Sequence, residues 1–257
     1  MAPRLPRLNP GALPAAHECR RKFAHTLTGT HRVRGDHRNT DRRFRLQNAV
    51  VSAVRRAHAE AAASGTPPSD ALVAETPPRD LEPEERTAFT EALEHYGHIA
   101  DARGGDVPRH PPPQFARMES RTGRYELSIT VDVALAIGDA LEVRRLAFAP
   151  PRVADLADLA DDPRARLTAL VLGANPGLRY AHLDLAAGAV HEIEIDEPMR
   201  RAWGAELQTT VLAALDDPDP PATPGLWCSS CEVVAGCPEV PSGELAGLAA
   251  PPGGEPG

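Results

Sequence analysis

The sequence predicts a mixed α/β fold, with a mixed sheet that carries helices on its faces. Two patterns predict it: segments in which apolar residues recur at helical spacing, and paired segments in which apolar and other residues alternate. They follow one another as helices, hairpin, helix, hairpin and helix, which favours helices packed on one mixed sheet. The 27 prolines, about twice average usage, place much of the remaining chain in loops and turns.

The helices are predicted from their period and their first turns. Residues 17–30 and 44–63 form the first two, and Pro83 with two following glutamates begins the third, over 83–102. Leu93 and Tyr96 of that helix are expected to face inward. Two further predicted helices cover 163–174 and 199–215.

Strands are predicted where apolar residues alternate. The first hairpin joins 125–136 to 140–148 through a turn at Gly138-Asp139. A second hairpin joins 180–185 to 190–195 around Ala187-Gly188. These segments place residues 17–240 in one domain, between a proline-rich lead (1–16) and a disordered Pro/Gly-rich tail (241–257).

Positive charge is concentrated at the start of the chain. Lys22 is the only lysine, and residues 1–60 hold thirteen basic side chains against four acids, a net charge of +9. The whole chain has a net charge of −8, so the residues after 60 carry a net charge of −17. The basic stretch Arg32–Arg56 suits contacts with nucleic-acid phosphates, although an arginine-rich solvated face explains the same charge.

No export signal or membrane-spanning run is recognisable. The segment Met1–Pro14 is broken by prolines and lacks an apolar core, and no apolar run reaches the length of a membrane span. We therefore expect a cytoplasmic protein with no membrane association. In that compartment cysteines serve metal binding or redox chemistry more often than disulfides.

Four cysteines form the most specific pattern in the chain. Cys228, Cys231 and Cys237 lie close together, and Cys19 lies more than 200 residues earlier. Four thiolates satisfy either a 4Fe–4S cluster or a structural zinc ion. Zinc ribbons usually supply two balanced pairs, so the one-plus-three division favours the iron–sulfur cluster and leaves zinc as the alternative.

This arrangement resembles the iron–sulfur branch of the PD-(D/E)XK nucleases, which includes RecB-like, AddB-type and CRISPR-adaptation exonucleases. Those proteins carry one cysteine in an N-terminal C-P-R-R-F-like helix, which 19–23 (CRRKF) matches except at Arg20. Their three C-terminal cysteines are matched by 227–231 (WCSSC) with Cys237-Pro238. The resemblance covers roughly 15–240 and implies a restriction-endonuclease-like core sheet, a cluster that joins the two ends of the chain, and DNA as the partner.

The catalytic motifs of that family are incomplete here. The metal-binding aspartate that ends a family strand is matched by Asp132. The (D/E)-x-K motif falls by family spacing on Arg145-Leu146-Ala147, or, with a shorter hairpin, on Glu142-Val143-Arg144. No alignment supplies the lysine, because none follows Lys22.

Two further family motifs are missing. Ser52 stands where the family's metal-binding helix histidine is expected. His58, six residues later, would face another side of the helix, and we expect it to be a solvated histidine at the helix end. The stretch 164–168 (RARLT) lacks the family's Q-x-x-x-Y motif.

The resemblance therefore implies Asp132 and Glu142 as ligands for Mg²⁺ or Mn²⁺, with Arg144 in place of the catalytic lysine. Arginine supplies positive charge but does not act as a base, so we expect impaired or lost cleavage. The leading prediction is a DNA-binding iron–sulfur protein whose helicase or nuclease partner supplies the chemistry. The alternatives are an active metal-dependent DNA exonuclease and a zinc-stapled interaction protein without a nucleic-acid role.

Overall fold

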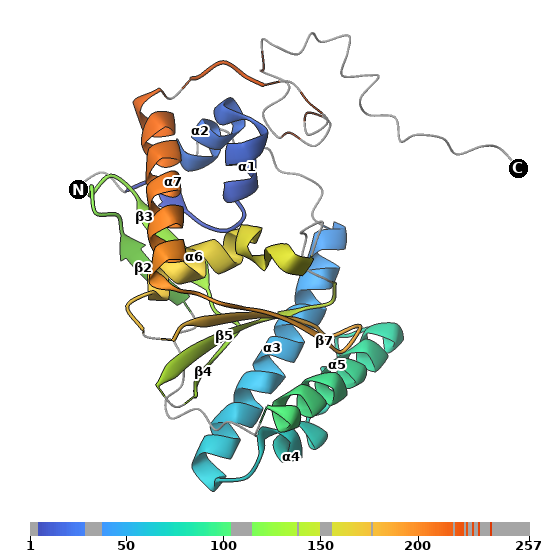
Figure 1. Cartoon of the computed structure of the whole chain (residues 1–257). Coiled ribbons are helices and arrows are strands. Elements are labelled where there is room, and N and C mark those ends of the chain that lie inside the picture. The colour runs from blue at the N-terminus through green and yellow to red at the C-terminus, as the bar shows by residue number, and fades with distance from the viewer. Residues whose placement is uncertain are drawn as a thin grey trace, which may run out of the picture. The chain divides into compact units, whose positions relative to one another are not determined.

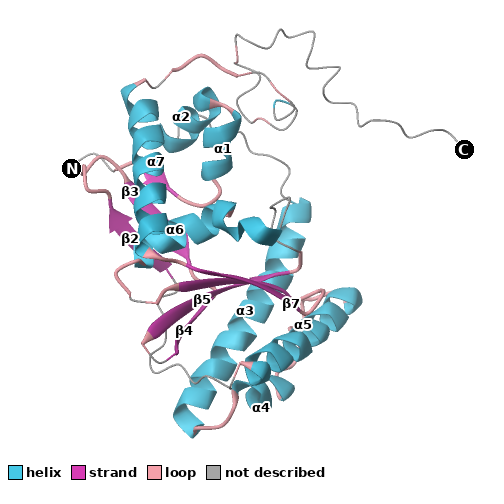
Figure 2. Cartoon of the chain, in the orientation of Figure 1, coloured by secondary structure: helices cyan, strands magenta, loops and turns pink. Residues whose placement is uncertain are grey.

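A computed structural model confirms the mixed α/β fold (Figures 1 and 2). It describes residues 5–28, 38–103, 115–137, 139–149, 156–175, 177–217, 219–223, 225, 228, 231 and 237. The helices are α1 (Leu13–Glu18), α2 (Arg20–Thr28), α3 (Arg38–Ser64), α4 (Pro68–Val73), α5 (Pro83–Ala102), the short 3-10 helix η1 (Leu156–Asp161), α6 (Pro163–Leu172) and α7 (Glu197–Asp216). The strands are β1 (Arg7–Leu8), β2 (Phe115–Glu119), β3 (Glu126–Thr130), β4 (Val133–Ile137), β5 (Ala140–Ala147), β6 (Arg179–Asp184) and β7 (Ala189–Glu194).

The chain divides into two compact units. The first comprises Met1–Asp36, Glu119–Leu127 and Gly204–Gly257, and the second His37–Met118 and Ser128–Trp203. The sequence predicts one domain over 17–240, and the boundary between the units falls inside that range. The proline-rich lead (1–16) also contributes side chains to the folded protein, because Leu8 and Leu13 are buried.

The second unit contains a four-stranded mixed sheet in the order β4-β5-β6-β7. The strands β4 and β5 are antiparallel, as are β6 and β7, whereas β5 and β6 run parallel. A parallel connection needs a crossover, which α6 provides. The strand β5 is therefore hydrogen-bonded on both edges, in the interior of the sheet.

Helices cover both faces of this sheet (Figure 1). One face packs against α3, α4 and α5 in the main core, which includes Val54, Phe89, Leu93 and Leu183. The opposite face carries α6. A charged residue on β5 is therefore enclosed whichever face its side chain points to.

The helix α5 has the predicted bounds, and Tyr96 and Leu93 face inward as expected. Its first turn is closed by a capping box, in which the side chain of Glu85 accepts a hydrogen bond from the Glu82 backbone N–H at 2.9 Å. Both predicted hairpins also form, and Gly188 adopts a φ of 64° in the second turn.

One predicted strand is broken. The alternating segment 125–136 forms β3 and β4, which belong to different sheets, with Val131 and Asp132 between them. Arg55 of α3 donates hydrogen bonds to the backbone carbonyls of both residues. A side chain distant in sequence thus satisfies backbone groups that a continuous strand would pair, which alternation alone does not reveal.

The helix α3 starts at Arg38, so residues 38–43 are helical rather than the loop that their polar composition indicates. The elements β1, β2, α1, α4 and η1 were not predicted, because each is short or rich in proline or alanine. The predicted disordered tail (241–257) lies outside the described residues, as do Arg32 and Arg34 of the basic stretch.

In the first unit, described residues near the start of the chain contact segments far from them in sequence. The strand β1 pairs in parallel with β3, Leu8 opposite Leu127. Arg21 of α2 forms an ion pair with Asp219, 2.6 Å from Nη2 to Oδ1. None of the described helices is both long and apolar enough to cross a membrane.

Candidate functional site

The strand β5 places Glu142 and Arg144 on the face covered by α3 and α5. Residues two apart on a strand share a face, and the register puts Glu142 opposite Leu135 and Arg144 opposite Val133 of β4. Both charged side chains are only 1% exposed. Their charges are therefore stable only with close partners.

Guanidinium groups occupy both carboxylate oxygens of Glu142. Arg144 Nε donates to Oε1 at 2.6 Å, and Arg103 Nη2 donates to Oε2 at 2.7 Å. Arg103, which caps the end of α5, also binds Glu192 Oε2 at 2.5 Å. A metal ion at Glu142 would have to displace one of two cations from an enclosed position.

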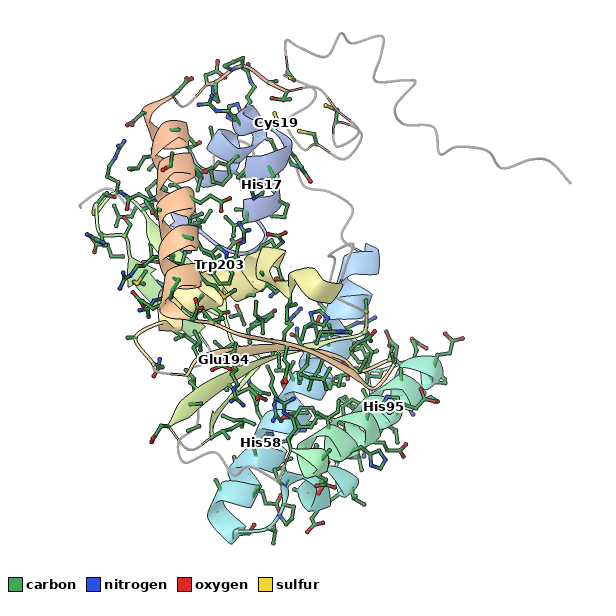
Figure 3. All side chains as sticks on the ribbon, viewed as in Figure 1. His17, Cys19, His58, His95, Glu194 and Trp203 are labelled. Carbon is green, nitrogen blue, oxygen red and sulfur yellow. The ribbon has the colours of Figure 1, made fainter. Side chains whose placement is uncertain are left out.

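The network continues from Arg144 into the helices. Arg144 Nη1 donates to the Tyr96 hydroxyl at 3.0 Å, and that oxygen lies 2.7 Å from His58 Nε2. His58 projects from α3 toward α5 and is only 5% exposed (Figure 3). The expectation of a solvated histidine at the helix end was therefore wrong, because α3 packs against α5 along this length.

Proton positions in the network follow from burial. Burial, and then the charge of Arg144, lower the pKa of His58 to about 4, so its ring is neutral near pH 7. Burial raises the pKa of Tyr96, which keeps its proton. Because Arg144 is only a donor, Tyr96 accepts from it and donates to His58 Nε2. The proton of His58 is then on Nδ1, which has no hydrogen-bond partner among the described residues.

Asp132 has a different set of partners. Its Oδ2 accepts hydrogen bonds from Arg145 Nη1 at 2.6 Å and from the Leu146 backbone N–H at 3.0 Å. Only 6% of the Asp132 side chain is exposed. A second carboxylate proposed as a metal ligand is thus also held by a guanidinium.

The structure does not bring Asp132 and Glu142 together. Arg144 and Arg145 are adjacent on β5, so their side chains point to opposite faces, and each binds one of the two carboxylates. Asp132 therefore faces Arg145-Leu146-Ala147, the alignment given by family spacing, which has neither acid nor lysine. Among the residues that the structure describes, no three His, Cys, Asp or Glu side chains are grouped to hold a metal ion.

A second polar cluster on the α6 face was missed from the sequence. It contains Tyr180 and His182 of β6, which lie on the face of Arg145 because Arg145 and His182 are paired across β5 and β6. The charges of Asp162 and Arg164 at the start of α6 act on Tyr180. The only sequence signal for this cluster was the presence of polar side chains in an apolar strand.

Two atoms of this cluster lack a hydrogen-bond partner among the residues that the structure describes. The Tyr180 hydroxyl and His182 Nδ1 are buried without a hydrogen bond in the described part of the chain. His182 Nε2 lies 2.8 Å from the Ala149 carbonyl oxygen, an acceptor, so Nε2 carries the proton of this histidine. Burial lowers the pKa of His182 and raises that of Tyr180, so both side chains are neutral.

The four cysteines belong to the first unit, and no disulfide joins any of them. Cys19 is buried at the end of α1 (Figure 3), and its Sγ accepts a hydrogen bond from the Thr223 backbone N–H at 3.5 Å. Cys228 Sγ accepts from the Gly225 N–H at 3.4 Å, and the Cys231 N–H donates to the Cys228 carbonyl in a tight turn. Backbone N–H groups therefore contact the sulfur atoms of both Cys19 and Cys228.

Comparison with known proteins assigns no function. No protein-family model matches the chain, and no curated protein matches it. One solved structure, described as the crystal structure of SSO0001, is similar over 75% of this chain and 84% of its own, at 12% sequence identity and a TM-score of 0.33. A likeness this weak carries no argument about fold or function.

We predict that Glu142→Gln lowers the free energy of unfolding by about 3 kcal/mol, because it leaves two guanidinium groups without a buried counter-charge. Urea denaturation measures the change. Glu192→Gln is the matched control, since it removes a carboxylate from the same Arg103 at a site that is 54% exposed. It should cost less than about 1 kcal/mol. Equal losses would contradict a buried network centred on Glu142.

A second prediction concerns pH. The pKa of His58 is about 4 in the folded protein and about 6.5 in the unfolded chain, so between these values only the unfolded chain binds the proton. The stabilisation is complete above pH 6.5 and is lost as the pH falls toward 4, by up to about 3 kcal/mol.

His58→Gln should flatten this part of the stability profile, measured by urea denaturation at a series of pH values. His98→Gln, which removes an exposed histidine from α5, should leave the slope unchanged. A wild-type slope in the His58 variant would mean that other groups cause the pH dependence.

Proposed function

We propose that this chain is a non-cleaving, DNA-binding protein of the PD-(D/E)XK type that holds a 4Fe–4S cluster through Cys19, Cys228, Cys231 and Cys237. One observation supports the proposed loss of cleavage. Asp132 and Glu142 each form an ion pair with an arginine, and the two arginines point to opposite faces of the sheet. Hydrolysis of a phosphodiester by this family's chemistry needs a metal ion held by converging carboxylates.

The order of elements supports the family assignment. The resemblance implies a helix, a strand position bearing an aspartate, an adjacent strand with the second motif, and then a helix. The chain supplies α3, Asp132 immediately before β4, the antiparallel partner β5, and α6 in that order. This support comes from the order of the elements alone, because several residues of the family's motifs, such as the histidine and the lysine, are replaced in this chain.

The cysteine segments support a cluster that staples the two ends of the first unit. The contacts of Thr223 with Cys19 and of Asp219 with Arg21 bring the C-terminal segment to the helix that carries the isolated cysteine. The donor set of four cysteine side chains, none of them in a disulfide, fits a 4Fe–4S cluster. Such a cluster would hold these segments together, and we place the protein in the cytoplasm, where thiols stay reduced.

The basic N-terminal residues support DNA as the partner. The net charge of +9 over residues 1–60 comes almost entirely from arginine, which binds phosphate with fixed geometry. A helicase or nuclease that acts with this chain would supply the cleavage.

We predict that the purified protein binds single- or double-stranded DNA with an affinity that falls steeply as salt rises, because binding releases counterions from phosphates. It should not cleave DNA, even at high Mn²⁺. Fluorescence anisotropy and gel analysis of end-labelled DNA measure the two properties. Metal-dependent cleavage that Asp132→Ala abolishes would overturn the loss of catalysis and establish an active exonuclease.

We also predict about four irons and four sulfides per chain after anaerobic purification, with a broad brown absorption. The Cys228→Ser variant should lose both the metal and the colour. One zinc ion per chain without colour would replace the cluster by a structural zinc site and remove the main support for the family assignment.

A further inference from the structure

We propose that the α6 face of the second unit binds one phosphate oxyanion without a metal ion, through Arg164, Arg145 and the Tyr180 hydroxyl. The inference rests on the proposed function and deepens it, by assigning a phosphate contact beside Asp132, which pairs with Arg145.

The sheet brings these groups to one face. Arg145 of β5 is paired with His182 of β6, and Tyr180 lies two residues before His182 on the same face. The helix α6 lies on one side of the sheet (Figure 1), with Asp162 as its N-cap and Arg164 in its first turn. Tyr180 therefore shares a sheet face with Arg145, and the charges of Arg164 and Arg145 both influence the pKa of Tyr180.

Arg164 is the unusual member of the cluster. No hydrogen bond or ion pair to its guanidinium is found within the described residues, and burial followed by the charge of Arg145 lowers its pKa. The nearby carboxylates are engaged elsewhere. Asp162 Oδ1 accepts from the backbone N–H groups of Arg164 and Ala165, at 2.6 and 3.4 Å, and Asp132 binds Arg145.

Tyr180 supplies the second, independent observation. Its side chain is 2% exposed, and its hydroxyl has no partner among the described residues. A buried hydroxyl without a hydrogen bond is destabilising, and so is a partly buried guanidinium whose N–H donors make no hydrogen bond, even with the charges of Asp132 and Asp162 acting on it. A single ligand that accepts hydrogen bonds and carries negative charge removes both costs.

A phosphate group fits this donor set best. Arg164 offers several N–H donors in a planar fork, Arg145 retains donors beyond the one used by Asp132, and Tyr180 adds an O–H. The buried acceptor His182 Nδ1 adds a preference, because a phosphate that carries a hydroxyl can donate to it and an internal phosphodiester cannot. A terminal phosphate or free phosphate should therefore bind more tightly than an internal one.

The test measures two ligands in EDTA with the full chain. Calorimetry follows inorganic phosphate, and anisotropy follows a short labelled single strand with or without a 5′-phosphate. Arg164→Ala and Tyr180→Phe should each weaken phosphate binding by roughly tenfold or more. Arg179→Ala is the matched control, because it removes an exposed arginine that is adjacent to Tyr180 on β6.

Tyr180→Phe separates binding from folding. It deletes an unpartnered hydroxyl, so the variant should be at least as stable as the wild type while binding phosphate less tightly. A merely structural role for Tyr180 would not produce that combination.

The outcomes distinguish this site from the proposed function. If wild-type protein binds DNA and Arg164→Ala behaves like Arg179→Ala for both ligands, the phosphate site is wrong and DNA binding stands. If phosphate binds in an Arg164- and Tyr180-dependent way and DNA does not, the site stands with a small phosphate ligand and the DNA proposal fails. Absence of phosphate binding by the wild type in EDTA overturns the site.

Discussion

The second unit depends on pairing the charges that β5 carries into its interior. With strands on both edges and helices on both faces, Glu142 and Arg144 cannot reach water, and an unpaired charge there would cost several kcal/mol. They neutralise each other, and α5 supplies Arg103 at its end and Tyr96 at its centre. The packing of α3 against α5 is coupled to the same network, because the partner of Tyr96 on α3 is a neutral, buried histidine.

The alternation of side chains along β5 separates the two carboxylates that the family resemblance implies as metal ligands. Two adjacent arginines on β5 point to opposite faces, and each takes one of the carboxylates that a nuclease would direct to a common metal ion. A guanidinium supplies positive charge toward a phosphate, but it generates no nucleophilic hydroxide and is never a base at neutral pH. The arginine-rich site proposed on this sheet would therefore suit the binding of a phosphate better than the hydrolysis of its ester.

The first unit meets a different constraint, the closure of a chain whose ends are more than 200 residues apart. Contacts near Cys19 and in the segment 219–228 bring those ends together, through an ion pair and backbone N–H donors to sulfur. A shared cluster or ion would fix this closure, since a link between distant segments removes many conformations from the unfolded chain. The polar contacts of the two units therefore differ: arginine–carboxylate pairs surround the sheet of the second unit, whereas the first unit has an ion pair and backbone N–H groups that contact sulfur.

The sequence alone determined what depends on short-range periodicity and local start signals: the mixed α/β fold, the bounds of α5, both hairpins and the residues at which charged side chains enter β5. Tertiary structure decided what depends on partners distant in the chain. The break at Asp132 requires Arg55 and Leu146, and the burial of His58 requires Tyr96. The α6-face cluster could not be predicted, because strand register and the placement of α6 select which polar side chains meet. The periodicity of the sequence limits which residues can be buried. Only strand register and helix packing decide which charged side chains become neighbours.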